Sequence, residues 1–272
     1  MKLKKSFSFS DKKQIWRLLI NNNNKLFVET RDIEKKEAFF HCFDLAKGKK
    51  IFKNFQMEEK FWIGIEAVKD NVILFHKFIK PDMPEHKQVI AYDIIQQKVI
   101  WENLDYSFLT IFENKIYVFK QMFEGKQFFA LDFVTGEVVE ELGRDVIVIN
   151  EIVNKAREEE DYSEYKYPES TNEFLDEKNK IIITKETDAA VIIGDIEVLQ
   201  IENLLMFNYH SKVEGNWIEN NFVAYQLDKN KKLISDTINK NLNAYVPDSF
   251  FVYKNLVILL KNKNEIIVYR IV

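Results

Sequence analysis

The chain has 272 residues, 46% of them hydrophobic and 14% aromatic, which is enough apolar material for a large core. Acidic and basic residues nearly balance, with a net charge of −4, so the strongly basic surface of a nucleic-acid-binding protein is excluded. Since Cys42 is the only cysteine, no intrachain disulfide is possible.

The N-terminal segment MKLKKSFSFSDKKQ (1–14) begins with basic residues but lacks the run of ~7–15 apolar residues that a signal peptide needs. No stretch approaches the ~18 apolar residues of a membrane-spanning helix. The sequence therefore predicts a cytoplasmic protein without a membrane span.

Four segments share one pattern, in which an apolar strand, a polar turn and a second strand with a large apolar residue follow one another. They are FHCFDLAKGKKIF (40–52), VIAYDIIQQKVIW (89–101), FFALDFVTGEVVE (128–140) and, more weakly, FVAYQLDKNKKLI (222–234). Repeats spaced by ~40–50 residues are typical of solenoids, propellers and arrays.

A second pattern precedes each of these segments. An Asn-containing turn leads into a run of β-branched and aromatic residues, at 22–30, 69–77, 113–121, 202–210 and 254–262. Another such run lies upstream of most of them, at 61–68, 108–113, 197–202 and 250–253. Each unit then has four antiparallel strands, which is the composition of a β-propeller blade.

The two ends of the chain complement each other. The last unit stops at EIIVYRIV (265–272), one strand short of a blade, and DKKQIWRL (11–18) reads as the missing fourth strand. An unpaired sheet edge is unfavourable. We therefore predict that residues 13–19 pair with residues 265–272 and close the ring.

The number of blades depends on the long gap between the Asn turns. These turns lie at Asn24, Asn71, Asn114, Asn203 and Asn255. In the gap, residues 150–178 show no strand alternation and begin with helical composition, whereas 179–194 read as one extra hairpin. We expect one all-β domain over 1–272, a small β-propeller of five blades with a helical or loop insertion at about 150–178. Six blades are the alternative.

The first pattern resembles the repeat of quinoprotein-type propellers, which are related to PQQ-dependent dehydrogenases. The residues that carry this resemblance are Tyr92, Asp93 and Trp101; Leu131, Asp132, Thr135 and Gly136; and Phe43, Asp44 and Gly48. The whole chain also resembles an uncharacterised bacterial family of single-domain propellers, which implies no activity.

The quinone-binding enzymes have a larger ring, paired cysteines near the quinone and metal-binding acids, for which this chain has too few residues and cysteines. We therefore expect no PQQ and no other cofactor. Many proteins with this repeat act as assembly scaffolds, and the resemblance implies that role here.

Several conspicuous residues have local explanations. Asp44, Asp93 and Asp132 begin polar turns, where an aspartate accepts hydrogen bonds from amides two or three residues later. Trp16 and Trp101 are expected to fill the space between neighbouring blades. Cys42, flanked by phenylalanines, is expected to be a buried thiol and not a nucleophile.

The sequence contains no catalytic or metal-binding motif. His41, His76, His86 and His210 show neither HxH nor HExxH spacing, and no acid stands at a ligand interval from them along the chain. No GxSxG motif and no Gly-rich phosphate loop occurs among the seven glycines. We expect no metal site.

Five acids are weak catalytic candidates. Asp105, Asp195 and Asp248 precede the strands expected to line the central channel, and Glu66 and Glu197 lie within such strands. Ring symmetry would gather them at one mouth of the channel, where two carboxyl groups ~5–10 Å apart could hydrolyse a glycosidic bond. The alternative is that these acids cap loops by accepting hydrogen bonds from backbone amides.

The insertion is the other candidate region. A charged run with three tyrosines suits a protein contact, because loops on a rigid scaffold often carry recognition. The residues concerned are Arg157, Glu160, Tyr162, Tyr165 and Tyr167.

Together, these patterns favour a non-enzymatic cytoplasmic scaffold that binds an unidentified protein and no nucleic acid. The alternatives are a carbohydrate-active hydrolase with carboxylates at the channel mouth, or a sensor that binds a small molecule or an ion.

Overall fold

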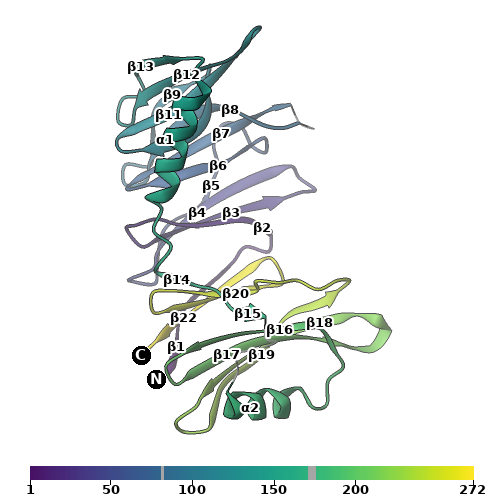
Figure 1. Ribbon diagram of the computed structural model, residues 1–272. Helices are drawn as coiled ribbons and strands as arrows, with labels where there is room; N and C mark the ends of the chain where they lie inside the picture. Colours follow the sequence, from purple (N-terminus) through teal and green to yellow (C-terminus); the bar gives the residue numbers. More distant parts are fainter. Residues whose placement is uncertain (81–82, 171–175) are drawn as a thin grey trace. The chain divides into compact units, whose positions relative to one another are not determined.

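The computed structural model describes residues 1–80, 83–170 and 176–272 (Figure 1). The chain is all-β and forms two compact units. We call residues 14–161 the central unit, and residues 1–13 with 162–272 the terminal unit. No helix within the described ranges is long and apolar enough to cross a bilayer.

The central unit contains three four-stranded antiparallel sheets, each made of consecutive strands. The first comprises β2 (Gln14–Ile20), β3 (Lys25–Asp32), β4 (Glu37–Asp44) and β5 (Lys49–Phe55). The second comprises β6 (Ile63–Lys69), β7 (Val72–Lys80), β8 (Met83–Asp93) and β9 (Lys98–Asn103). The third comprises β10 (Ser107–Phe112), β11 (Lys115–Met122), β12 (Gly125–Asp132) and β13 (Val138–Gly143), and helix α1 (Val146–Glu158) follows.

The terminal unit contains two sheets with the same four-stranded core and one short extra strand each. One has the order β15 (Glu169–Ser170), β16 (Ile192–Ile201), β17 (Leu204–Lys212), β18 (Ile218–Gln226) and β19 (Lys231–Leu242). The other has the order β1 (Leu3–Ser10), β22 (Glu265–Ile271), β21 (Leu256–Lys261), β20 (Phe250–Tyr253) and β14 (Tyr165–Lys166). Helix α2 (Glu177–Thr187) precedes β16.

These five antiparallel sheets confirm the predicted five-fold repeat and agree with a small β-propeller. One backbone hydrogen bond recurs and joins the two sequence patterns. Its acceptor is the backbone carbonyl of the turn asparagine, and its donor is the amide of the residue that follows the acid of the polar turn or the residue in its place. The Leu45 amide donates to the Asn24 carbonyl at 2.9 Å, and the Ile94 amide donates to the Asn71 carbonyl at 2.9 Å. The same bond joins Phe133 to Asn114 and Leu227 to Asn203.

The turn aspartates have the predicted local role. Asp93 Oδ1 accepts the amides of Ile95 and Gln96, both at 2.7 Å, and Asp132 Oδ1 accepts the amides of Val134 and Thr135. Asp44 Oδ1 accepts the amide of Lys47 at 2.9 Å. Turn chemistry therefore accounts for the recurrence of these three aspartates.

An N-terminal strand completes the C-terminal sheet, as predicted, but the predicted strand was wrong. Strand β22 pairs with β1, with Phe9 opposite Ile266, and the backbones of Lys2 and Val272 exchange two hydrogen bonds of 2.7 and 3.0 Å (Figure 1). Residues 14–20 instead form β2, the first strand of its own sheet, which pairs with β3. The segment KKSFSFS alternates polar and apolar residues, which is the period of a half-buried strand.

The predicted hairpin at 179–194 was also wrong in its first half. Residues 177–187 form α2, whose N-cap Asp176 accepts the amide of Asn179 at 2.7 Å. The β-branched run suggested a strand, but the cap and the packing of Ile182 and Ile183 against β16–β18 override that propensity. Helix α1 begins at Val146, and β14 and β15 follow it; residues 171–175 of the expected insertion lie outside the described residues.

Within each unit, neighbouring sheets pack against each other through apolar cores. In the central unit, Phe27, Phe40 and Phe75 belong to the core between the first and second sheets, and Leu74, Val118 and their neighbours join the second and third. Helix α1 packs on the third sheet, and α2 packs on the β15–β19 sheet (Figure 1).

The two tryptophans differ from each other. Trp101 packs against Gly136 and donates to the Phe133 carbonyl at 3.3 Å, so it fills the predicted space between sheets. Trp16 is 56% exposed, and the Arg31 guanidinium lies 5.0 Å from its ring.

We expect Cys42 to resist alkylation in the folded chain. The side chain is buried, and this burial raises the pKa of its thiol from 9.0 to about 12, so little thiolate exists near neutral pH. Because the unfolded thiol titrates lower, unfolding releases a proton between these two values, and the free energy of unfolding falls as the pH rises through that window. Ellman's reagent should label the chain in guanidinium and not in buffer; rapid labelling of native protein would contradict the buried placement.

Candidate metal centre

Glu66, His76 and His86 meet on one face of the second sheet. They come from the neighbouring strands β6, β7 and β8. Glu66 stands at a register shift between Ile65 and Ala67, where β6 bulges against β7. A bulge re-aims a side chain, and here it places the carboxylate beside the two imidazoles.

Both histidines make a short contact with the same carboxylate oxygen of Glu66. Nδ1 of His76 and Nδ1 of His86 each lie 2.8 Å from Glu66 Oε2. The His86 contact has hydrogen-bond geometry, whereas the His76 contact is equally short but, among the described residues, lacks that geometry. The two rings stack with centroids 3.5 Å apart and planes inclined by 8°.

The electrostatics of the cluster favour the ligand forms of its side chains. Burial of the Glu66 carboxyl raises its pKa, but the two imidazoles outweigh this effect and bring the pKa down to about 2. Burial lowers the pKa of His76, and Glu66 offsets only part of that shift. Near neutral pH the structure therefore presents an ionised carboxylate and a neutral imidazole, which are the forms that bind metals.

The spacing of the three ligand atoms fits a metal ion. All three lie within 4.8 Å of one another. Two ligand atoms at ~2.0–2.2 Å from one ion, at angles of ~90–110°, are ~2.9–3.5 Å apart, close to the 2.8 Å contacts. Two imidazoles and a carboxylate are typical ligands of Zn²⁺ and related transition metals.

One ring must turn before both lone pairs can point at the same ion, since the stacked rings are nearly parallel. The side chain of His86 is 35% exposed and has room to turn, whereas that of His76 is 4% exposed. In a metal centre built from these residues, Glu66 and His76 would form the fixed part and His86 would be the adjustable ligand. Three protein ligands leave at least one coordination position for water or a substrate.

The wall behind His76 is closely packed. A Cβ atom on Gly64 would lie 3.0 Å from His76 Cε1, so any larger residue there would require the imidazole ring to shift by a few tenths of an ångström. Arg31, beside it, donates to Glu29 Oε1 at 2.7 Å and to the carbonyls of Phe61 and Ile63. This buried ion pair joins β3 to β6 and holds the backbone behind the imidazole.

The other candidate acids lie elsewhere. Asp105 forms an exposed ion pair with Lys120 at 3.2 Å. Glu197 is buried in β16 and accepts the Asp248 amide at 3.2 Å. Burial raises the pKa of Tyr245 to about 12, and the negative charges of Glu197, Asp195 and Asp248 add to the shift, so these three acids surround one phenol.

The insertion residues are divided between the two units. Arg157 lies in the last turn of α1, and its carbonyl accepts the Glu160 amide at 3.2 Å. In the terminal unit, Tyr165 packs 4.9 Å from Tyr253, while Tyr162 and Tyr167 are 61% and 52% exposed.

The expectation of no metal site stays a prediction. It rested on spacing along the chain, which does not show that Glu66, His76 and His86 are neighbours across strands. His76 and His86 lie on the consecutive, paired strands β7 and β8, and their separation of ten residues along the chain was the signal available in the sequence.

Comparisons with known proteins add no activity. Residues 20–101 match a family model described as a domain of unknown function, DUF4905. No curated protein matches the chain.

The similar solved structures share little sequence with the chain. One is described as a crystal structure of the eukaryotic initiation factor, with 9% identity and a TM-score of 0.35; the match covers 94% of this chain and 52% of that one. Another is the uncharacterised protein lmo1340 from Listeria monocytogenes EGD-e, with 10% identity, a TM-score of 0.34 and coverage of 93% and 94%.

A third is the β-propeller domain of the Trilobed protease from Pyrococcus furiosus, with 10% identity, a TM-score of 0.32 and coverage of 93% and 64%. The chain thus spans about half the length of the initiation-factor chain that it matches. TM-scores this low establish no shared function.

Proposed function

We propose that this chain binds a divalent transition-metal ion of the zinc class through Glu66, His76 and His86. The observation that carries the proposal is the convergence of two imidazole nitrogens on one carboxylate oxygen at 2.8 Å. The low pKa of Glu66 and the lowered pKa of His76 support it, because protons then compete weakly with the metal.

Titration of the metal-free full chain with Zn²⁺ in a calorimeter tests this function. Wild type should bind one Zn²⁺ ion tightly, and His76→Ala should lower the affinity at least ~100-fold, because loss of even an indirect contact to a ligand costs ~10–100-fold. His86→Ala should weaken binding less than His76→Ala, since His86 must first turn.

The matched control is Asp105→Asn, which removes an exposed carboxylate of the same unit and should leave Zn²⁺ affinity unchanged. Melting curves recorded with EDTA show whether each variant folds. Equal Zn²⁺ affinity in wild type and a folded His76→Ala chain would overturn the proposal.

We also propose a scaffold role in protein binding through the segment that holds Tyr162, Tyr165 and Tyr167. Strand β14 anchors this segment by pairing with β20, and the ring of Tyr167 stacks on that of Phe251 with centroids 5.8 Å apart. The backbone that carries the exposed tyrosine rings is therefore fixed to the sheet. Aromatic residues are enriched at protein interfaces. The resemblance to quinoprotein-type scaffolds favours the same role, without a quinone.

Capture from the native host with wild type and with the Tyr162→Ser/Tyr167→Ser double variant tests the scaffold role. A partner held by wild type and lost by the folded variant is the expected result. Retention of every partner by the variant would contradict it.

A further inference from the structure

A cavity of about 490 Å³ opens in the terminal unit, and Glu66, His76 and His86 are not among its lining residues. Its lining comes from the end of β19, the loop that leads to β20 and the turn between β21 and β22. The lining residues include four asparagines and two lysines, and none of the described lining residues is acidic. The cavity therefore offers hydrogen-bond donors and positive charge, while its lining residue Tyr245 lies beside the carboxylates of Glu197, Asp195 and Asp248.

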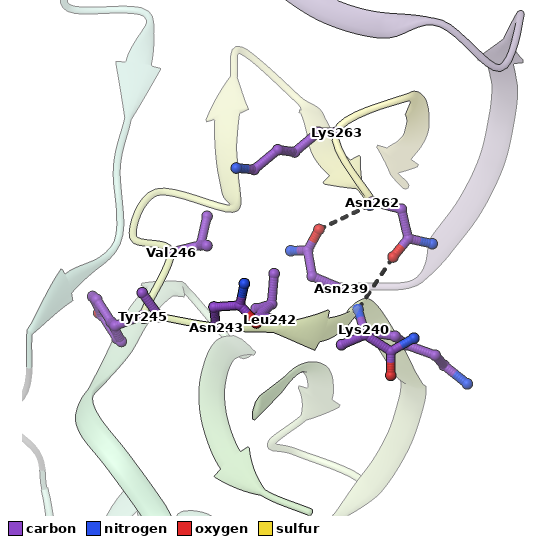
Figure 2. A pocket seen from close by; sticks show the side chains of 10 residues that line it. Asn239, Lys240, Leu242, Asn243, Tyr245, Val246, Asn262 and Lys263 are labelled. Atoms are coloured by element: carbon purple, nitrogen blue, oxygen red, sulfur yellow. Dashed lines mark hydrogen bonds between the residues drawn. The ribbon is translucent and has the colours of Figure 1, made fainter. Parts of the chain in front are cut away.

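Hydrogen bonds within the wall orient one of these donors. Asn239 is 3% exposed, and its Oδ1 accepts the amide of Asn262 at 2.8 Å. Because the oxygen is held by a backbone N–H, the Nδ2 group must face the other way, and its only contact with a described residue is a 3.5 Å bond to Ser249 Oγ. Figure 2 shows this nitrogen pointing into the cavity.

Two more nitrogen atoms approach from other segments. In Figure 2 the side chain of Lys263 extends over the cavity toward Val246, and the amide of Asn243 points up into it from the opposite wall. The side chain of Lys240 extends away from the cavity. Asn262 Oδ1 accepts the Lys240 amide at 3.2 Å and so ties the β21–β22 turn to β19.

We propose that this cavity binds a small molecule that carries a phosphate monoester group, with Lys263, Asn239 and Asn243 as the donors to its oxygens. A phosphate monoester has three terminal oxygens, so it can accept hydrogen bonds from three donors that approach from different directions. A carboxylate has two oxygens in one plane, which match the planar fork of an arginine better. Lysine binds phosphate as a point charge.

The size of the cavity sets the class of ligand. Small-molecule sites are typically ~300–1,000 Å³, whereas free phosphate would fill only a small part of such a volume. Leu242 and Val246 add an apolar wall, which suits the carbon skeleton of the ligand. The phosphate group of the ligand is therefore held by the polar donors, and its carbon skeleton occupies the remaining volume of the cavity.

Calorimetric titration of the full chain with glucose 6-phosphate, glycerol 3-phosphate, inorganic phosphate and sodium acetate tests the proposal. The two monoesters should bind at least ~10-fold more tightly than acetate, and Lys263→Gln should weaken monoester binding ~10-fold. Lys240→Gln is the matched control, since it removes the same charge from the same rim, and it should leave the affinity unchanged.

Asn239→Leu should also weaken binding, and a melting curve shows whether that buried substitution folds. Absence of binding by both monoesters, or equal weakening by Lys240→Gln and Lys263→Gln, would overturn the proposal, since the second result indicates only general attraction to a basic rim. The titrations include EDTA, so failure at the metal centre and failure at this cavity are distinguishable.

Discussion

Replacing Glu29 by alanine is expected to lower the free energy of unfolding by about 3–5 kcal/mol. Glu29 and Arg31 are 1% and 4% exposed, and Arg31 Nη2 lies 2.6 Å from Glu29 Oε1. Without Glu29 the guanidinium keeps its buried position but loses its counter-charge. The amide of Ile65 also loses its acceptor, Glu29 Oε2.

Urea denaturation of wild type and Glu29→Ala measures this difference. The exposed ion pair between Lys115 and Glu140 supplies the control, because Glu140→Ala removes a 2.8 Å contact at the surface and should cost well under ~1 kcal/mol. The double variant Glu29→Leu/Arg31→Met should be more stable than Glu29→Ala, since it leaves no buried charge unpaired. A Glu29→Ala chain as stable as the Glu140→Ala chain would contradict the buried placement.

Removing residues 1–10 is expected to prevent the terminal unit from folding. Strand β1 pairs with β22 over its whole length, and Phe9 is 4% exposed. Deletion exposes the backbone of β22 as an unpaired edge and uncovers apolar side chains, which favours aggregation. The truncated chain should lose its cooperative melting transition for this unit and elute as large species.

A synthetic peptide with the sequence of residues 1–13, added during refolding, should restore the native transition by supplying β1 in trans. The control peptide exchanges Phe7 and Phe9 for serine and should not restore it. A truncated chain that melts like wild type without any peptide would show that β1 is dispensable.

The repeat predicted most of the fold because its signals depend on residues that are close together in the sequence. Asn turns, turn aspartates and runs of β-branched residues are short-range signals, and each sheet is made largely of consecutive strands. What failed were assignments that depended on distant partners. Both β1 and β2 have strand character, and only pairing across the whole chain decides which of them joins β22.

Helix α2 also shows that local sequence signals fail where distant contacts decide the structure. Its run of isoleucines favours a strand by intrinsic propensity, but Asp176 caps the first turn and Ile182 and Ile183 pack on a sheet formed later in the chain. Propensity is a weak guide where tertiary packing decides.

The residues of the proposed metal centre could be predicted only in part. Glu66 stood out as an acid within a strand, while His76 and His86 were set aside because no metal-binding motif spans them. Their meeting depends on the register of β7 with β8 and on the bulge at Glu66, neither of which is visible in linear spacing. The proposed phosphate site was not anticipated, since its donors come from a strand, a loop and a turn of ordinary polar composition.

X-ray absorption spectroscopy of the zinc-loaded full chain examines the ligands themselves. The ion should show nitrogen and oxygen neighbours at ~2.0–2.2 Å together with the outer-shell scattering of two imidazole rings, and His76→Ala should remove one ring's contribution. A spectrum with no imidazole scattering, or one unchanged by His76→Ala, would contradict the assignment of Glu66, His76 and His86 as a metal centre.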